Sequence, residues 1–193
     1  MRDVVDEVGA MAESAGLAAV PSVVRELLRH AKASARLVAH LHLVHDVATL
    51  LTAGCHSVAS AFDERAIAFG AATHDIGKAL HPNELRASGS QHETSGERWL
   101  IEQGCEPQLA RFARTHGLHA SDASLMIEDL FVIAADKLWK GKRVVEVEER
   151  LVRELAKCTD AEFWDLWSQL SALFDDVADG ADRRLQWQSE FSV

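Results

Sequence analysis

The chain has 193 residues, of which 48% are hydrophobic, and it carries a formal net charge of −10 at pH 7. This length fits one domain, or a domain with a helical extension, whose core is large enough for folding without disulfides or a structural metal. Because an acidic chain gains nothing from counterion release, the charge argues against binding of extended nucleic acid. A small phosphorylated substrate is compatible with it, since a metal and a few local cations can reverse the field inside a pocket.

The cysteines and the N-terminus indicate the compartment. Cys55, Cys105 and Cys158 lie far apart and form no CxxC pair, which favours buried thiols in a reducing cytoplasm. The opening segment MRDVVDEVGAMAES is charged and amphipathic, unlike a signal peptide. No run approaches the ~18 consecutive apolar residues of a membrane span. We therefore expect a cytoplasmic protein that does not contact a membrane.

The composition and the spacing of apolar residues predict an all-α fold. The chain is rich in Ala, Leu and Glu, with three prolines and no tyrosine, which favours helix over strand. Apolar residues recur at helical spacing almost throughout. Only RVVEVE alternates as a strand does, and it is too short and isolated to form a sheet.

The first predicted helices have recognisable start and stop residues. A short helix begins near Val4 and ends near Gly16, and Ser22 can cap a second one. Ser34 opens a longer helix, which Gly54 can close.

The later predicted elements continue this pattern. Asp63 can cap DERAIAFGAATHD, which Gly77 interrupts, and the breaker-rich HPNELRASGS follows as a loop. HETSGERWLIEQG and EPQLARFARTH are two short helices, and SLMIEDLFVIAADKLWKG is a longer one ending at Gly141. From Val144 to about Leu185 the pattern predicts one or two amphipathic helices rich in aromatic residues.

These elements suggest three parts of one domain. Residues 1–33 are predicted to be N-terminal helices that pack on a core formed by residues 34–143. Residues 144–193 are predicted to be a C-terminal helical cover belonging to the same domain. The aromatic residues of this cover suit either packing on the core or the interface of a homodimer.

A His-Asp pair ends an apolar helix in the segment GAATHDIGK. His74 and Asp75 place an imidazole and a carboxylate at one point, and Gly77 lets the backbone turn away and leaves room for a ligand. Neighbouring side chains on a helix diverge by about 100°, so one can bind a metal terminally while the other approaches from the side or bridges to a second metal. The dipeptide alone is common, and by itself it would favour a structural role.

Three further residues change that interpretation. Asp136 lies in the apolar run VIAADKLWKG, where a buried carboxylate needs a partner or a metal. His92 begins a helix after the ASGS loop, and His116 ends another helix after LARFART. Imidazoles and carboxylates are ligands that suit Mn, Fe, Co, Ni or Zn, and thiolates are not needed.

The order of these residues resembles the HD superfamily of metal-dependent phosphohydrolases, and most closely its HDIG-type members. The matching segments, between Ser34 and Arg143, are AHLHLVHDVA, FGAATHDIGKAL, QHETSGERWL, LARFARTHGLH and VIAADKLWKGKR. HDIGK with a downstream ADK is the specific combination. The resemblance implies a single-domain helical HD-domain fold with additional C-terminal helices, in which residues 34–143 are the metal-binding core.

The resemblance also implies a set of metal ligands, with Asp75 as the bridge where two ions are bound. Members that cleave cyclic dinucleotides carry adjacent histidines and a GYP signature, and both are missing here because Gly117 follows His116. A cyclic-di-GMP activity is therefore not expected. The implied ligands are His40, His74, Asp75 and Asp136 for one ion, with His92 and His116 added for two.

The first ligand has two candidates. Family members usually show this histidine followed four residues later by Val and eight later by Ala, and His40 with Val44 and Ala48 fits. His45 fits this pattern less well. His40 is the predicted ligand, and His45 is the rival, or a group that supports the ligands from behind.

The predicted function is metal-assisted hydrolysis of a small phosphate ester, either a monoester or a diester, with nucleotides among the candidates. One or two divalent ions (Mn, Fe, Co, Ni or Zn, with Mg also suitable) would lower the pKa of a bound water from about 16 towards about 7 and would stabilise phosphoryl charge. Asp75 and Lys78 are the predicted catalytic residues. The predicted substrate-binding residues are Arg36, Lys78, His119, Lys140 and Arg143.

Two other functions are left open. Six ligands of this type can hold two irons, and a few proteins of the HD superfamily are dinuclear iron oxygenases. A non-catalytic module could also use the metal pocket to sense a nucleotide. Iron content with oxygen consumption would identify the first, and ligand binding without turnover would identify the second.

Overall fold

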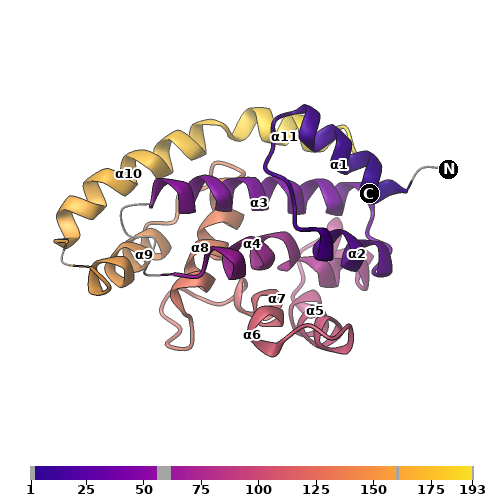
Figure 1. The fold of residues 1–193 in the computed structure, drawn as a ribbon, viewed down its shortest axis with the longest axis horizontal. Helices are drawn as coiled ribbons and strands as arrows, with labels where there is room; N and C mark the ends of the chain where they lie inside the picture. The colour runs from indigo at the N-terminus through magenta and orange to yellow at the C-terminus, as the bar shows by residue number, and fades with distance from the viewer. Residues whose placement is uncertain (1–2, 56–61, 160, 193) are drawn as a thin grey trace.

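The computed structural model of the chain describes residues 3–55, 62–159 and 161–192, and within these ranges it contains helices and no strand (Figure 1). The all-α prediction is thereby confirmed. The elements in chain order are α1 (Val4–Ser14), α2 (Ser22–His30), α3 (Ala35–Gly54), α4 (Glu64–Thr73), the short 3-10 segments η2 (Ile76–Ala79) and η3 (Pro82–Leu85), α5 (Gln91–Glu102), α6 (Pro107–Ala110), α7 (Phe112–Thr115), α8 (Ile127–Leu138), α9 (Val145–Lys157), α10 (Phe163–Asp179) and α11 (Ala181–Ser189).

Helix α3 forms the centre of the fold, and α4 and α8 pack against it (Figure 1). It begins as predicted at Ser34, whose hydroxyl accepts a hydrogen bond from the N–H of Leu37 at 3.4 Å. Between Leu37 and Ala48 every side chain except that of Asp46 is buried. A helix that is surrounded by protein on all sides is a core element, and its polar side chains must find partners there.

The length and composition of α3 would also suit a membrane crossing, with a mean hydropathy of 1.2. It is the one helix with this property in the described ranges. However, 67% of the apolar window is buried inside the protein, and the core helix of a globular protein passes the same test. The expectation that no membrane is involved stays a prediction.

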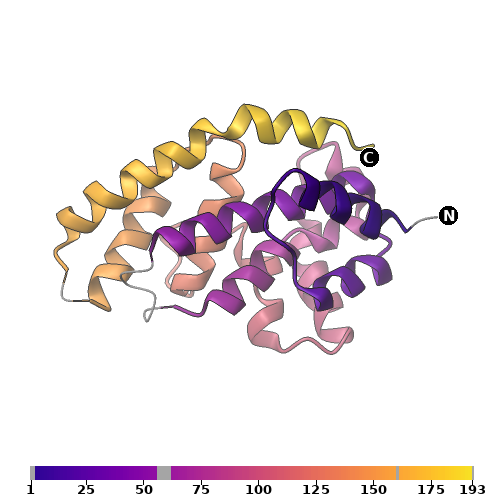
Figure 2. The same ribbon diagram turned by 45° about the horizontal axis from the view of Figure 1, so that its top comes forward.

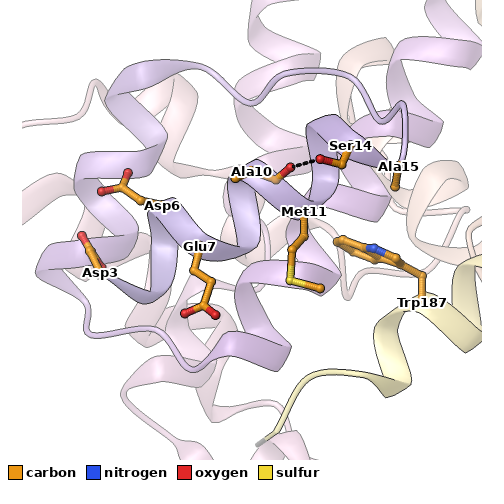
Figure 3. A pocket seen from close by; sticks show the side chains of 8 residues that line it. All are labelled: Asp3, Asp6, Glu7, Ala10, Met11, Ser14, Ala15 and Trp187. Carbon is orange, nitrogen blue, oxygen red and sulfur yellow. Dashed lines mark hydrogen bonds between the residues drawn. The ribbon is translucent and has the colours of Figure 1, made fainter. Parts of the chain in front are cut away.

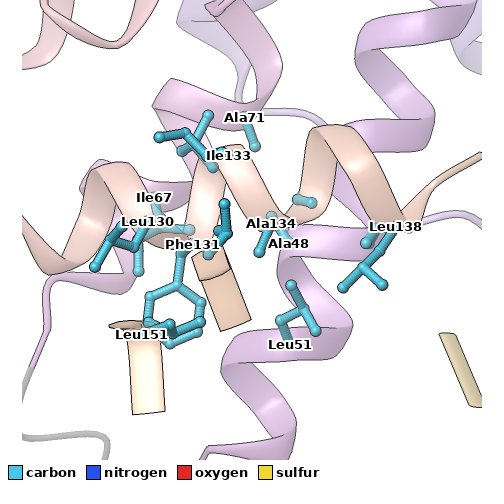
Figure 4. Packing of buried hydrophobic residues seen from close by; sticks show 14 of the residues in the cluster. Ala48, Leu51, Ile67, Ala71, Leu130, Phe131, Ile133, Ala134, Leu138 and Leu151 are labelled. Carbon is cyan, nitrogen blue, oxygen red and sulfur yellow. The ribbon is translucent and has the colours of Figure 1, made fainter. Parts of the chain in front are cut away.

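Two clusters of buried hydrophobic side chains share α3. The larger one joins α3, α4 and α8 to α9 and α10, and it includes Leu51, Phe131 and Leu151 (Figure 4). The other joins α1, α2 and the first half of α3 to α5, and Phe191 near the C-terminus belongs to it. Helix α1 therefore packs on α3 at one end and α10 at the other, while α9 packs on α8 and α10. The boundaries drawn at residues 33/34 and 143/144 fall between helices and remain predictions.

The C-terminal helices are tied to the beginning of α3 and to the end of α8. The chain ends near its N-terminal helices, and α10 and α11 run across α3 (Figure 2). The N–H of Arg36 donates to the carbonyl of Ser192 at 3.0 Å. The buried guanidinium of Arg184 donates to the carbonyls of Trp139 at 2.8 Å and Leu138 at 3.1 Å, at the C-terminal end of α8.

Two of the predicted helix starts have different outcomes. Asp63 caps α4 as predicted, since its carboxylate accepts from the N–H groups of Arg65 at 2.9 Å and Ala66 at 3.1 Å. Ser22 does not cap α2, because the helix already includes it and Pro21 occupies the N-cap position without a side-chain hydrogen bond.

Two segments contain more helix than predicted. The loop HPNELRASGS includes the 3-10 turn η3, which begins with a proline whose missing N–H costs nothing at a helix start. The C-terminal segment forms α9, α10 and α11 rather than one or two helices, because α9 ends at Lys157 before α10 begins at Phe163, and a turn at Gly180 separates α10 from α11.

Candidate metal centre

The six predicted metal ligands meet at one place between α3, α4, α5, α7 and α8. Four imidazoles and two carboxylates converge there, and they form two groups in each of which the ligand atoms lie within 4.8 Å of one another. The first ligand group is His40, His74 and Asp136, and the second ligand group is Asp75, His92 and His116.

The turn after α4 brings Asp75 to the second ligand group. Helix α4 ends at Thr73, and the chain passes through His74 and Asp75 into η2. There Gly77 packs directly on the backbone of α5, where a Cβ atom would collide with the carbonyl oxygen of His92. This contact between two backbones holds the segment that carries Asp75 against the helix that carries His92.

Asp75 lies between the two groups, and each of its oxygens faces a different one. Oδ2 lies 3.0 Å from Nε2 of His40 and 3.6 Å from Nε2 of His74. Oδ1 lies 3.1 Å from Nε2 of His92 and 3.3 Å from Nε2 of His116. One carboxylate is thus shared by nitrogen atoms from both groups.

The other ring nitrogen of three histidines is occupied by an acceptor. Nδ1 of His74 lies 2.9 Å from the carbonyl of Ala71, and Nδ1 of His116 lies 3.0 Å from the carbonyl of Ala113. Nδ1 of His92 lies 2.5 Å from the carboxylate of Glu84. Since these oxygens accept hydrogen bonds, Nδ1 keeps a proton in each ring, and Nε2 is the nitrogen that can present a lone pair to a metal.

Two of the converging atoms have no hydrogen-bond partner among the described residues. In the described part of the chain, neither Nε2 of His74 nor Oδ1 of Asp75 makes a hydrogen bond, although both are buried. Buried polar atoms are almost always paired, and lone pairs that face one another are stabilised by a cation.

The charge state of the carboxylates agrees with this. Burial by itself would raise the pKa of Asp75, but the neighbouring imidazoles, His74 foremost, outweigh it and hold that pKa well below its usual range. Burial likewise opposes the ionised form of Asp136, yet the nearby imidazole of His74 and the ammonium groups of Lys137 and Lys140 lower its pKa. Both groups are anionic at neutral pH. Two carboxylates and four imidazoles fit a divalent transition metal, and this chemistry defines the site as a candidate metal centre.

Comparisons of this chain with protein-family models, with curated proteins and with solved structures found no match. A metal centre is thus indicated by the geometry of these residues, and the arrangement is consistent with an HD-type helical site.

A cavity of about 560 Å³ opens above the ligands, a size typical of small-molecule sites. Three of the predicted substrate-binding residues, Arg36, Lys78 and Lys140, line it. Lys78 follows Asp75 by one helical turn, and its Nζ lies 2.6 Å from Oδ2 of Asp75. Burial lowers the pKa of Lys140, and this is partly offset by the charge of Asp136. The cavity therefore combines an acidic floor with cationic walls.

Three predicted residues lie outside this cavity. His119 is exposed, and its Nδ1 accepts from the N–H of Ser121 at 3.2 Å. Arg143 is turned away, because Glu148 binds its guanidinium at 2.7 Å and 2.8 Å. His45, the rival first ligand, is buried on another face of α3, since five residues along a helix correspond to a rotation of roughly 140°. The structure therefore places His40 at the candidate metal centre and places His119, Arg143 and His45 away from it.

Several cavity residues were missed in the sequence. Lys137 follows Asp136 directly and lies 2.7 Å from its Oδ2, so the ADK motif itself was the signal for it. Glu84 lies in the segment interpreted as a loop, and Gln188 lies in the C-terminal cover, where no candidate ligand was expected. For these two no periodic or motif signal exists, because only the tertiary fold brings them to the site.

Two larger cavities lie away from the candidate metal centre. One, of about 850 Å³, runs along α1 and is closed by Trp187 beside Met11 (Figure 3). Its carboxylates include Asp3 and Asp6, which are already paired with Arg29. The other, of about 840 Å³, is lined by α4, α6 and the residues before α8 and contains no histidine. Neither one collects metal-binding residues.

Proposed function

We propose that this protein is a metal-dependent phosphohydrolase whose centre holds two divalent ions, one in each ligand group. The observation that supports this most is the position of Asp75, whose two oxygens face nitrogen atoms of different groups at 3.0 Å and 3.1 Å. A shared carboxylate is suited to bridge two ions that act on one phosphoryl group. The same ligand set is implied by the resemblance to the HD superfamily.

Bound ions would supply a nucleophilic water at neutral pH and would stabilise the charge that develops on the phosphoryl oxygens. The chain itself has the tasks of holding the ions and orienting the ester. Asp75 and Asp136 stay ionised in this environment, and the Nδ1 contacts of His74 and His116 keep their Nε2 atoms turned inward. The ammonium group of Lys78 contacts the carboxylate of Asp75, and we assign to it the binding of a phosphate oxygen of the substrate beside the ions.

The walls of the cavity support a small anionic substrate. Arg36, Lys78, Lys137 and Lys140 line it, although the chain as a whole has a net charge of −10. Such a local concentration of cations steers and binds an anion of limited size. We assign a small phosphomonoester or phosphodiester, nucleotides included, rather than extended nucleic acid. The ions would be Mn, Fe, Co, Ni or Zn, with Mg also suitable, and the site would work in the cytoplasm.

The same residues could serve two other functions, which the experiment below separates. A di-iron oxygenase of the HD type would use the six ligands, and a sensor would bind a nucleotide without turnover. The cationic walls favour an anionic ligand and therefore support the hydrolase and the sensor over the oxygenase.

Release of phosphate or nitrophenol from a panel of mono- and diesters tests the proposal, with Mn²⁺, Co²⁺, Ni²⁺ or Mg²⁺ added. We expect metal-dependent turnover in the wild type. Asp75→Asn should lower it by more than about 100-fold, since a direct ligand should matter more than the outer contacts whose loss typically costs 10–100-fold.

The matched control is Asp182→Asn, an exposed carboxylate on α11, which should keep wild-type turnover. Turnover that survives in Asp75→Asn, or that needs no metal, would contradict the proposal. A wild type that retains two irons and consumes oxygen would be the oxygenase. One that binds a nucleotide without cleaving any ester would be the sensor.

A further inference from the structure

Glu84 makes three contacts at the edge of the candidate metal centre. Its Oε2 lies 2.5 Å from Nδ1 of His92 and accepts from the backbone N–H of His92 at 3.1 Å. Its Oε1 accepts from the backbone N–H of Gln91 at 3.1 Å. The side chain is 11% exposed, so these contacts are largely shielded from water.

The backbone contacts complete the start of α5. Ser90 occupies the N-cap position of this helix but its side chain makes no capping hydrogen bond. Glu84 supplies the missing acceptor from the preceding turn η3, and its charge is favourable at the positive end of the helix dipole. These contacts therefore hold the first turn of α5, which carries His92, in a fixed position.

The side-chain contact distinguishes His92 from the other ligands. His74 and His116 donate from Nδ1 to backbone carbonyls, which are neutral acceptors. His92 donates to a carboxylate. A carboxylate behind a ligating imidazole fixes its tautomer and makes it a stronger donor to a metal.

The local backbone is built around this carboxylate. A Cβ atom at Gly89 would collide with Oε1 of Glu84, so a side chain there would push the carboxylate out of its contact with the start of α5. The turn η3, the glycine and the start of α5 thus enclose one acidic side chain.

We propose that Glu84 is a positioning residue that holds His92 in the Nδ1–H tautomer and thereby sets the affinity of the second ligand group for its metal ion. This inference rests on the proposed metal centre and deepens it. Glu84 does not touch the ion. It acts through His92, so its removal should weaken binding of the ion in the second ligand group and leave binding by the first ligand group unchanged.

Calorimetric titration of the metal-free protein with Mn²⁺ tests this, with the wild type compared to Glu84→Ala. We expect two equivalents in the wild type. In Glu84→Ala one equivalent should lose about 10–100-fold in affinity, the range found for such outer contacts, while the other equivalent should be unchanged.

Because Glu84→Ala also removes the cap of α5, the double variant Glu84→Ala/Ser90→Asp serves as the control. Asp is a good N-cap residue and should restore thermal stability without contacting the imidazole. Metal affinity should stay low in the double variant. Recovery of affinity together with stability would overturn the proposal, because Glu84 would then act only as a cap.

The ¹⁵N chemical shifts of the His92 ring in the metal-free protein give a readout independent of metal. We expect a protonated Nδ1 in the wild type and a mixture of tautomers, or the Nε2–H form, in Glu84→Ala. An unchanged tautomer would overturn the inference even if two ions bind. A wild type that binds no Mn²⁺ but shows the Glu84-dependent tautomer would instead contradict the proposed function.

Discussion

Two histidines on α3 show how the surroundings decide what a buried imidazole does. His40 faces the carboxylates of Asp75 and Asp136. His45 is also buried but pairs with no acidic side chain, and in the described part of the chain its Nδ1 has no hydrogen-bond partner. Burial therefore lowers the pKa of His45 to about 4. The first is suited to bind a cation, and the second is held neutral in the core.

The depressed pKa of His45 makes stability depend on pH in a defined direction. The unfolded chain binds a proton on this residue near its ordinary value of 6.5, whereas the folded chain does so only near 4. Its contribution to stability is thus fully present above pH 6.5 and is lost as the pH falls through 4. Between pH 7 and 4.5 we expect a loss of roughly 2–3 kcal/mol from this residue, at about 1.4 kcal/mol per pKa unit.

Chemical denaturation of the wild type and of His45→Met at both pH values measures this loss. The variant should lose less stability than the wild type, and the difference should match the contribution above. His30→Met, at an exposed position on α2, is the control and should follow the wild type. An equal loss in wild type and His45→Met would show that His45 does not stay neutral in the fold.

Sequence reasoning reached part of this residue-level picture. The spacing of Val44 and Ala48 favoured His40 over His45, and the structure brings His40 to His74 and Asp75. The side chains that surround these residues could not be predicted. Arg143 and His119 looked suitable because they are near the motifs in sequence, but Glu148 and Ser121 hold them elsewhere.

At the level of elements, the close packing of η2 on α5 builds the site. Gly77 faces the carbonyl of His92 and the N–H of Gly96, so two backbones touch where side chains normally separate helices. The distance from Asp75 to His92 depends on that contact. Gly77 therefore acts through packing, whereas its sequence context had suggested only a turn and room for a ligand.

Substitution Gly77→Ala should separate these two elements. We expect a loss of about 1–3 kcal/mol in the free energy of unfolding, as for other overpacked sites, together with weaker binding of one metal equivalent. Gly9→Ala is the matched control, because nothing lies within 4 Å of a Cβ there, and removing a glycine from α1 should stabilise it by up to ~1 kcal/mol. Denaturation and metal titration measure both effects. Equal stability of the two variants would contradict the packing role.

The elements most visible in the sequence were those with helical periodicity and a clear cap. Asp63 and Ser34 mark real helix starts. The turn η3 was missed because a 3-10 segment of four residues is too short to show a period. That omission also hid Glu84, since a carboxylate in a loop is ordinarily a solvated surface group.

At the scale of the whole molecule, the C-terminal helices complete the site that the central helices begin. Gln188 of α11 lines the cavity above the ligands, and Arg184 ties the same helix to the end of α8, near Asp136. The sequence predicted a helical cover, but it could not reveal where the cover lies, because amphipathic spacing does not specify which face it packs on. Whether the protein forms a homodimer stays a prediction.

The distribution of charge is likewise a property of the assembled fold. Cations from α3, η2 and α8 gather at one cavity of an acidic protein, and carboxylates from α8 and the turn after α4 gather beneath them. The sequence indicated the donor atoms through HDIGK and ADK. Their convergence on two groups with a shared Asp75 follows only from the packing of five helices.

Anomalous diffraction from crystals grown with Mn²⁺ tests the central claim most directly. We expect two peaks at the metal edge, one within the first ligand group and one within the second, with Asp75 beside both and His45 beside neither. A single peak within one group would contradict the two-metal centre. The absence of any peak among these six residues, with metal bound elsewhere, would contradict the metal centre itself.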